Sequence, residues 1–574
     1  MTRKINYDGW SKEELIKELR RIKETKYGLV WHRDLPEEKI DVLINPDART
    51  PSEMFPNEMA GKPFPVLKEV KSKEIDTNKN GPVNILIEGD NYHSLAVLNF
   101  THYEAIDLIY IDPPYNTGNR DFTYNDKIVD VEDPFRHSKW LSFMEKRLKL
   151  SKCLLKKTGV IFISIDDNEL AQLKMLCDEI FGEKNLVGIV SVAKGTTTGQ
   201  DAKRFGSSAD YILVYGMKDF VLGKLDLTEK DKKRFSRKDK NGLYSILQWR
   251  KTGNGDRRQD RPNLYYPVLG PDGKEVYPTG PTGYQSRWRG DIKNFKSLEK
   301  RGMVEWIKQD NLYRPYVKFY LEGRVKAPSN LWTDLEGNKK ATIELKEIFD
   351  SEKVFSNPKP TDLIRRCINL ANVPDPVVLD FFAGSGTTAH AILKLNEEDG
   401  GNRRFILCTN NEELDNNGSK IKHRICSDVC YPRIARIIKG YKNYKKEIIE
   451  GLGGNLKYYA CDFVEAEPTD RNKRKLVNES TEMLCIKENA FELVQNENDF
   501  KIFKNNDTHL GIIFYEEAIN DFKKAIKKIE GHFNVYVFSL GDDTHEKQFI
   551  DVKSRVTLCA IPEVILKVYR EIFK

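Results

Sequence analysis

The 574-residue chain lacks several features that would assign it to whole classes of protein. No run of roughly 18 apolar residues occurs and the first residues contain no apolar signal core, so the sequence predicts a soluble protein that is neither inserted in a membrane nor exported. Its nine cysteines are scattered, as is typical of reduced thiols in the cytoplasm. Internal repeats and low-complexity tracts are absent, and no GxxxxGK(S/T) phosphate loop occurs, which argues against an ATP-driven motor.

The composition is that of a folded protein with several domains. Hydrophobic residues make up 39% and charged residues 32%, enough for buried cores and a solvated surface, and the length suggests about three or four domains. The net charge of +7 is unevenly distributed, because residues 231–261 include eleven basic and four acidic residues. Tyr244, Trp249, Tyr265 and Tyr266 lie in or just beyond this window. Cations bind phosphates and aromatic rings stack on bases, so the window is either a nucleic-acid surface or a solvated basic loop.

Short apolar strands alternate with longer helical segments over two stretches of the chain. In the first stretch we expect strands at 84–90, 107–115, 159–167 and 209–216, with helices at 138–155 and 169–182. In the second we expect helices at 341–349, 361–371 and 431–440, a helix beginning near 386, and strands at 376–382 and 403–409. This alternation predicts an α/β fold with an open, largely parallel sheet.

Three other regions depart from that alternation. Residues 11–25 have the pattern of an amphipathic helix. From about 220 to 330, Gly, Pro, Arg and Tyr dominate, which indicates an inserted domain rich in surface. After about 470 we expect a separate small α/β unit, with strands at 509–515, 534–540 and 555–561 and helices at 516–529 and 562–573.

A glycine-rich turn follows one of the predicted strands. Residues 377–392, VVLDFFAGSGTTAHAI, form an apolar strand that ends at Asp380, a glycine loop and the start of a helix. Gly384 and Gly386 permit a tight turn and close approach of a ligand at the carboxyl end of the strand. With Ala389 they also satisfy GxGxxA, so these residues alone leave an NAD or FAD site, or a simple packing role, as alternatives.

A second strand, LIYIDPPYNTG at 108–118, ends in Asp112, Pro113, Pro114 and Tyr115. Two consecutive prolines cannot continue a central strand, so the tetrapeptide must leave the sheet and present its polar groups to a pocket. A fixed carboxylate and a carbonyl beside proline can accept the hydrogens of an exocyclic amine and favour its nucleophilic form. Tyr115 can stack on a base swung out of a duplex. The alternative is a strand-ending Asp before an ordinary Pro-Pro turn.

Together, DPPY and FAGSG resemble the motifs of the DNA amino-methyltransferases that use S-adenosylmethionine. Their order, with a basic insert between them, resembles the beta class, and five further segments resemble the Mod subunits of type III restriction-modification systems. These segments are IEGDN at 87–91, RPNLYYP at 261–267, NPKPTDLI at 357–364, GGNLKYY at 453–459 and EMLCIKENAF at 482–491. The resemblance implies a Rossmann-like methyltransferase sheet with an inserted target-recognition domain and a small C-terminal α/β domain.

The resemblance also implies roles for individual residues. Asp112 and the Pro113 carbonyl would orient the amine within the DPPY turn, and Tyr115 would stack on the base. S-adenosylmethionine would lie against Asp90, Lys359, Pro360, Thr361, Asp380, Phe381, Phe382, Ala383, Gly384, Gly386, Thr387, Thr388 and Glu412. Glu413 is an alternative to Glu412 as the acid that holds the ribose. At 209–210 the chain has Ala-Asp where the family often has His-Glu, so no base contact is carried over there.

The implied domain boundaries follow these motifs. Residues 1–75 would be an N-terminal helical, partner-facing segment, 76–220 the catalytic half of the methyltransferase core, 221–335 the target-recognition domain, 336–465 the cofactor half, and 466–574 the C-terminal domain. Within the target-recognition domain, we expect DNA contacts from Arg250, Lys251, Arg257, Arg258, Arg261 and Tyr265.

The resulting hypothesis is a cytoplasmic, site-specific DNA adenine-N6 methyltransferase, the modification and recognition subunit of a type III system. Its partners would be duplex DNA, a second copy of itself and a separate ATP-dependent helicase-nuclease. Alternatives are a DNA-binding specificity subunit, a solitary regulatory methylase, a cytosine-N4 enzyme and an NAD-dependent enzyme. We expect no metal, since His423, Cys426 and Cys430 have no second ligand pair at zinc-like spacing, and we expect Asp166 and Asp167 to cap a helix rather than form a catalytic pair.

Overall fold

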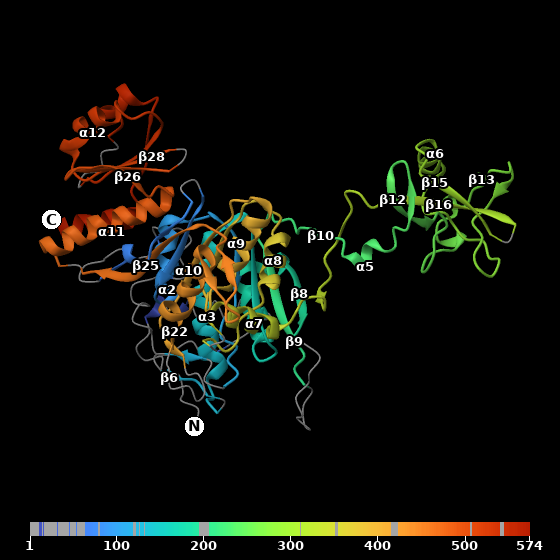
Figure 1. The fold of residues 1–574 in the computed structure, drawn as a ribbon, viewed down its shortest axis with the longest axis horizontal. Coiled ribbons are helices and arrows are strands. Elements are labelled where there is room, and N and C mark those ends of the chain that lie inside the picture. The colour runs from blue at the N-terminus through green and yellow to red at the C-terminus, as the bar shows by residue number, and fades with distance from the viewer. Residues whose placement is uncertain are drawn as a thin grey trace. The chain divides into compact units, whose positions relative to one another are not determined.

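The computed structural model contains two compact units, a larger unit of residues 1–223 and 329–574 and an insert of residues 224–328 (Figure 1). It describes residues 11–13, 15–16, 31, 45, 53, 63–78, 81–118, 122–124, 127–130, 132–194, 206–309, 311–350, 354–414, 423–465, 467–505, 508–539 and 545–573. Ten of the fifteen residues of the helix predicted at 11–25 lie outside these described residues, and residues 12, 13, 15 and 16 are helical.

The larger unit is built on one mixed sheet. From edge to edge its strands are β1 (Phe64–Glu69), β25 (Asn455–Val464), β3 (Val83–Glu88), β20 (Arg404–Thr409), β19 (Val377–Asp380), β4 (Ile106–Ile111), β7 (Leu155–Ile165), β9 (Ala209–Gly216), β8 (Leu186–Ala193) and β18 (Leu331–Trp332), with β2 (Ile75–Asp76) beside β25. The strands from β25 to β7 pair in parallel, whereas β9 is antiparallel to β7. The predicted Rossmann-like α/β sheet is therefore confirmed.

Helices cover both faces of this sheet. The first group is α2 (Asn91–Thr101), α3 (Arg136–Leu154) and α4 (Leu170–Cys177), and the second is α7 (Asn338–Ile348), α8 (Thr361–Leu370), α9 (Thr387–Asp399) and α10 (Tyr431–Lys439). Ile109 and Ile111 of β4 share a core with Leu95 and Trp140 of the first group, whereas α8 and α9 pack together and contact β4 and β20. All six residues of β4 are buried, as expected for a central parallel strand covered on both faces.

The N-terminal boundary differs from the prediction. Residues 64–69 belong to the segment predicted to be helical, but they form edge strand β1, antiparallel to β25. Phe64, Val66 and Leu67 are fully buried there. The first four residues of β1 are all buried, so the strand lacks the alternation of a half-buried strand, and its partner β25 lies almost 400 residues away.

The insert has a sheet and a small core of its own. Its antiparallel strands are, in order, β11 (Arg237–Asp239), β12 (Gly242–Gln248), β16 (Leu312–Tyr320) and β15 (Val304–Gln309). Phe295 of helix α6 (Ile292–Lys300) packs in the core with Trp249, Trp288 and Val317. Smaller elements are β10 (Leu225–Asp226), α5 (Glu229–Lys232), β13 (Val268–Leu269), β14 (Glu275–Val276) and β17 (Val325–Lys326). Loss of the α/β alternation in the sequence thus corresponds to a compact antiparallel unit.

The C-terminal region forms its own sheet but not a separate compact unit. The sheet contains β26 (Glu492–Asn496), β27 (Phe500–Lys504), β28 (His509–Ile513), β29 (Phe533–Val537) and β30 (Val556–Leu558), with α12 (Ile519–Ile526). Helices α11 (Asp470–Glu488) and α13 (Glu563–Phe573) lie between this sheet and the main one, and Leu476 and Ile565 share the main core with Phe64. The predicted small C-terminal α/β domain has a core of its own around Phe500, Phe522 and Phe533, and α11 joins it to the larger unit by packing against β1 and α2.

Among the described residues, no helix is both long enough and apolar enough to cross a membrane.

Candidate active site

The two predicted motifs lie at neighbouring strand ends. Strands β4 and β19 pair in parallel, with Leu108 opposite Val378 and Ile109 opposite Leu379. Because parallel neighbours end at the same edge of the sheet, the DPPY turn after β4 and the glycine loop after β19 emerge side by side. The site is therefore assembled from segments that are far apart in the sequence.

Asp112, Tyr115 and Lys359 form a connected polar group at this edge. The Tyr115 hydroxyl donates to Asp112 Oδ1 over 3.0 Å, and Lys359 Nζ lies 3.0 Å from the same oxygen. Lys359 also donates to the Tyr115 hydroxyl over 2.6 Å, and its ammonium lies 4.6 Å from the centre of the Tyr115 ring. The segment around NPKP thus contacts the DPPY turn directly.

Burial and charge act in opposite directions on Asp112. Burial raises the pKa of the Asp112 carboxyl, and the positive charge of Lys359 partly opposes that rise. Burial, with the nearby Asp112 charge, raises the pKa of Tyr115 well above its ordinary value, so the phenol remains protonated and can donate. The arrangement keeps a hydrogen-bond acceptor and an aromatic ring together at the edge of the sheet.

The backbone of the turn is held by a residue that sequence reasoning missed. Trp140 on α3 is fully buried, and its indole nitrogen donates to the Pro114 carbonyl over 2.7 Å. Proline has no backbone N–H, so its carbonyl is the group that can anchor this part of the turn. No motif in the sequence distinguishes Trp140 from other apolar residues of α3.

The glycine loop has the conformation that its sequence predicts. Gly384 and Gly386 have φ angles of +49° and +77°, which favour glycine. A Cβ at Gly386 would lie 3.1 Å from Cys430 Sγ. Buried Arg433 donates to the Ser385 carbonyl over 3.2 Å and to Thr387 Oγ1 over 2.7 Å, so α10 holds the loop in place. Arg433 is another residue that the sequence analysis did not select.

Asp380 is committed to the loop that it precedes. Its carboxylate accepts from the Phe382 N–H over 3.0 Å and from Thr388 Oγ1 over 2.5 Å. Burial raises the pKa of Asp380 to about 7. Phe381 is fully buried, and the Phe382 ring lies 5.9 Å from that of Phe143.

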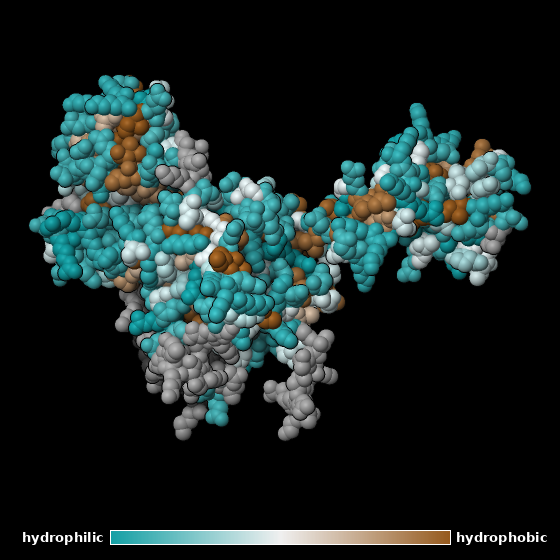
Figure 2. Space-filling model, viewed as in Figure 1, coloured by the Kyte–Doolittle hydropathy of each residue, from teal (hydrophilic) through white to brown (hydrophobic). Residues whose placement is uncertain are grey.

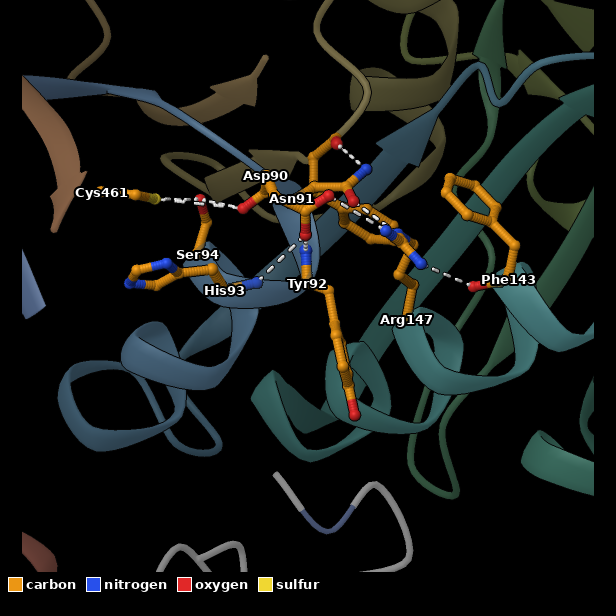
Figure 3. Close-up of polar contacts among 9 residues, drawn as sticks. Asp90, Asn91, Tyr92, His93, Ser94, Phe143, Arg147 and Cys461 are labelled. Carbon is orange, nitrogen blue, oxygen red and sulfur yellow. Dashed lines mark hydrogen bonds and ion pairs between the residues drawn. The ribbon is translucent and has the colours of Figure 1, made fainter. Parts of the chain in front are cut away.

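The IEGDN segment is hydrogen-bonded to α2 and α3, as Figure 3 shows, and it also contacts the glycine loop. Asp90 caps α2 by accepting from the Tyr92 and His93 N–H groups, and buried Arg147 donates to its other oxygen over 3.2 Å. Asn91 donates to the Phe381 carbonyl over 2.8 Å. The end of β3 is thereby connected to the glycine loop.

The remaining predicted cofactor residues lie at the same edge or beside it. Buried Thr361, which directly follows Lys359 and Pro360, is the first residue of α8. Its hydroxyl donates to Glu344 Oε1 over 3.0 Å. Glu412 follows β20 and is exposed, while Glu413 begins the short strand β21 (Glu413–Leu414).

Glu88 is an acid at this edge that sequence reasoning missed. It ends β3 opposite Thr409 of β20, and it accepts from Asn411 Nδ2 over 2.8 Å and from the Tyr458 hydroxyl. Its place at the end of a predicted strand could have identified it.

Asp210, which stands where the family often has Glu, is buried and lies 2.6 Å from Lys194 Nζ. It lines a small pocket with Ser164, Lys359 and Pro360. Asp210 therefore adjoins the site and keeps a carboxylate there, on a side chain one methylene shorter than that of Glu.

The predicted DNA-binding residues of the insert separate into two groups. Arg250 was wrongly assigned, because its side chain is buried and donates to Asp256, Ser286 and the Lys251 carbonyl. Arg257, Arg258 and Arg261 are exposed, whereas Lys251 and Tyr265 are half-buried. The guanidinium of Arg257 lies 4.8 Å from the Tyr284 ring and that of Arg258 lies 4.4 Å from the Tyr265 ring.

A basic groove of about 410 Å³ occupies another part of the insert. Arg234, Arg237 and Arg324 line it together with Phe319. Figure 2 shows that hydrophilic residues cover most of the visible face of the insert.

Comparison with known proteins identifies the family. A sequence model of the DNA methylase family matches residues 106–417, a range that includes both DPPY and the glycine loop. The chain belongs to the DNA methylase family. The membership expected from the two motifs is thus confirmed.

Three named proteins illustrate what the chain is similar to. The StyLTI type III restriction-modification Mod subunit of Salmonella typhimurium strain LT2 is 34% identical over 65% of this chain and 59% of that subunit. The EcoPI type III Mod subunit of Escherichia phage P1 is 34% identical over 66% of this chain and 65% of that subunit. The type II methyltransferase M.KpnI of Klebsiella pneumoniae is 36% identical over 63% of this chain and 89% of the methyltransferase. The chain thus matches less than two thirds of the length of either Mod subunit.

Proposed function

We propose that this chain is a site-specific DNA adenine-N6 methyltransferase that uses S-adenosylmethionine and serves as the modification and recognition subunit of a type III restriction-modification system. The observation that carries the proposal is the DPPY turn, where Asp112 and Tyr115 stand beside a glycine loop at one sheet edge. Membership in the DNA methylase family and the similarity to two Mod subunits support it.

The protein's own residues would act mainly by orienting the amine. The Asp112 carboxylate and the Pro113 carbonyl would accept the two amine hydrogens and hold the nitrogen lone pair in one direction, while Tyr115 stacks on the flipped base. Water would be excluded by the half-buried turn. S-adenosylmethionine, when bound, supplies an electrophilic methyl group.

Lys359 would have two tasks in this scheme. Its charge favours the ionised form of Asp112, because it opposes the rise in the pKa of that carboxyl that burial causes. It also occupies Asp112 Oδ1 at 3.0 Å, so the incoming amine must share or replace that contact. The charged side chain therefore tunes the acceptor and competes for it.

The residues present fit S-adenosylmethionine. Gly384 and Gly386 keep side chains out of the loop, and Phe382 and Ala383 lie between Asp380 and those glycines. Asp90 and Glu412 supply carboxylates at the same edge of the sheet. We propose Phe382, Ala383, Gly384 and Gly386 for the methionine and ribose parts of the cofactor, Glu412 for the ribose hydroxyls and Asp90 for the adenine. The hydroxyls of Thr387 and Thr388 are occupied by Arg433 and Asp380, so we propose that these residues shape the loop instead.

DNA would be recognised by the insert. Arg257, Arg258 and Arg261 are exposed cations that could contact phosphates. The Tyr284 and Tyr265 rings beside the first two could stack on bases. The groove lined by Arg234, Arg237 and Arg324 offers a second place for the backbone. Reading of a specific sequence would require polar side chains at base edges in the major groove.

A solitary methyltransferase is the second candidate. The 36% identity to M.KpnI extends over 89% of that enzyme, which is named as a type II methyltransferase and not as a Mod subunit. The two candidates share the chemistry and differ in partners. Co-purification of the full chain with an ATP-dependent helicase-nuclease encoded beside it would support the type III assignment, and the mass of the complex would report the proposed homodimer.

Methyl transfer from labelled S-adenosylmethionine to unmethylated duplex DNA tests the activity. Sequencing that detects modified bases would reveal N6-methyladenine within one short motif, whereas N4-methylcytosine would overturn the choice of base. Asp112→Ala should abolish transfer while leaving DNA binding largely unchanged. Transfer by that variant at the wild-type rate would refute the assignment of the site.

A further inference from the structure

A buried carboxylate lies behind the DPPY turn. The Glu169 side chain is 0% exposed and precedes α4. Asn116 Nδ2 donates to Glu169 Oε1 over 2.5 Å, and His137 Nδ1 lies 2.6 Å from the same oxygen. Glu169 and Asn116 take no part in the chemistry proposed above, yet Asn116 directly follows Tyr115 in the chain.

The backbone at Asn116 needs such support. Its φ angle is +54°, a left-handed conformation that costs free energy in residues other than glycine, although Asn adopts it more readily than most. The Asn116 side chain is fully buried. A hydrogen bond to an immobile carboxylate therefore fixes both the rotamer of Asn116 and the direction in which the chain leaves Tyr115.

The surroundings of Glu169 favour its ionised form less than water does. Burial raises the pKa of the Glu169 carboxyl, and the hydrogen bond from Asn116 and the nearby His137 and Arg136 on α3 oppose that rise. Arg136 Nη2 lies 3.4 Å from His137 Nε2. Gln172 Nε2 lies 3.3 Å from His137 Nδ1, so Glu169, Arg136 and Gln172 all contact this imidazole.

The pair is not arranged for stability alone. Within the described part of the chain, Glu169 Oε2 and Asn116 Oδ1 are buried without a hydrogen-bond partner. An unsatisfied buried oxygen costs stability, and structural networks usually satisfy both oxygens of such groups. A contact that fixes one geometry while neighbouring buried oxygens lack hydrogen bonds is typical of functional sites.

We propose that Glu169 is a positioning residue for methyl transfer, which fixes Asn116 and thereby the direction of Tyr115 and Asp112. Trp140 holds the turn at Pro114, and Glu169 holds it on the other side of Tyr115. The inference rests on the proposed function, because its effect is on the alignment of the amine.

Exchange of the two side chains tests this directly. Asn116→Asp places two carboxylates in contact, and we expect kcat to fall roughly tenfold to a hundredfold with little change in the KM for S-adenosylmethionine. Adding Glu169→Gln restores a pair of one carboxylate, now at position 116, and one amide, now at position 169, and both side chains keep their original lengths. We therefore expect kcat to return to within about threefold of wild type. Glu169→Ala should lose as much kcat as Asn116→Asp. Glu479→Gln removes another buried carboxylate, on α11, and should leave kcat unchanged.

The outcomes are separable from failure of the proposed function. If wild-type protein transfers no methyl group to any DNA, the proposed function fails before the variants are compared. If wild type is active and Asn116→Asp stays slow after Glu169→Gln is added, although the double variant melts like wild type and binds S-adenosylmethionine normally, the positioning role is refuted. Wild-type kcat in Glu169→Ala would refute it as well.

Discussion

Lys359 Nζ lies 3.0 Å from Asp112 Oδ1, and this contact joins the segment before α8 to the turn after β4. The contact places a positive charge beside the Asp112 carboxylate, which is proposed to accept the amine hydrogens. The same ammonium donates to Tyr115, so one side chain affects both the acceptor and the stacking ring. Substitution of Lys359 should therefore alter the pH dependence of the reaction as well as its rate.

Lys359→Met should move the acidic limb of the kcat profile to higher pH. Lys359 lowers the pKa of Asp112 against the effect of burial, so without it a higher pH is needed to ionise that carboxyl. Methyl transfer measured from pH 5 to pH 9 checks the shift. Lys340→Met is the control, because Lys340 pairs with Glu336 and Asp362 away from Asp112. A Lys359→Met profile that overlays wild type would contradict the proposed effect on Asp112.

Gly386→Ala should weaken binding of S-adenosylmethionine and destabilise the protein by about 1 kcal/mol or more. The new Cβ would stand 3.1 Å from Cys430 Sγ in a left-handed conformation, so the loop must shift. Calorimetric titration and thermal unfolding measure the two effects. Gly400→Ala is the matched control, because it has a similar φ angle of +71° but no heavy atom within 4 Å of the added Cβ. Equal loss of cofactor affinity in both variants would show that strain alone is responsible.

Asp380→Asn should remove one source of pH-dependent stability. The Asp380 carboxyl ionises near its ordinary 3.8 in the unfolded chain and near 7 in the folded protein, so the folded state binds more protons between these values. Its contribution to stability is therefore complete below the unfolded pKa and is lost as pH rises through about 7. Relative to Asp380→Asn, wild type should lose about 1 to 3 kcal/mol of unfolding free energy between pH 5 and pH 8. Urea unfolding at both pH values measures this, and a constant difference would contradict it.

Arg257→Ala with Arg258→Ala should weaken DNA binding and lower its dependence on salt. Each phosphate contact that is lost should reduce the slope of log K against log salt by about 0.9. Binding of duplex DNA at several salt concentrations measures that slope. Lys293→Ala with Lys296→Ala removes the same charge from α6, where both side chains are exposed. If both pairs change the slope equally, the net charge of the insert explains the effect rather than a defined surface.

Arg250→Ala should act on folding instead of DNA contact. Its guanidinium is buried against Asp256 and Ser286, so removal leaves these groups without their partner and should lower the melting temperature. Differential scanning calorimetry would detect the loss. A variant that melts like wild type but binds DNA poorly would restore Arg250 to the proposed DNA surface.

Local patterns in the sequence determined six strands of the main sheet, the two motif-bearing turns and the family, and those strands are β3, β4, β7, β9, β19 and β20. Apolar runs marked β4 and β19 because central parallel strands are buried on both faces, and proline and glycine marked the turns because of their restricted or unusual backbone angles. Those signals depend on residues that are adjacent in the chain. Lys359 was identified only because the segment NPKPTDLI at 357–364 resembles a family segment.

Tertiary structure alone decided which distant groups meet. Nothing local to Glu169, Trp140 or Arg433 indicates that they hold the catalytic turn or the glycine loop, because their partners come from other elements. Equally, Arg250 and Arg258 are indistinguishable in a basic window, yet one is buried and the other exposed. Burial and hydrogen-bond partners depend on how strands and helices pack, and no sequence window contains that information.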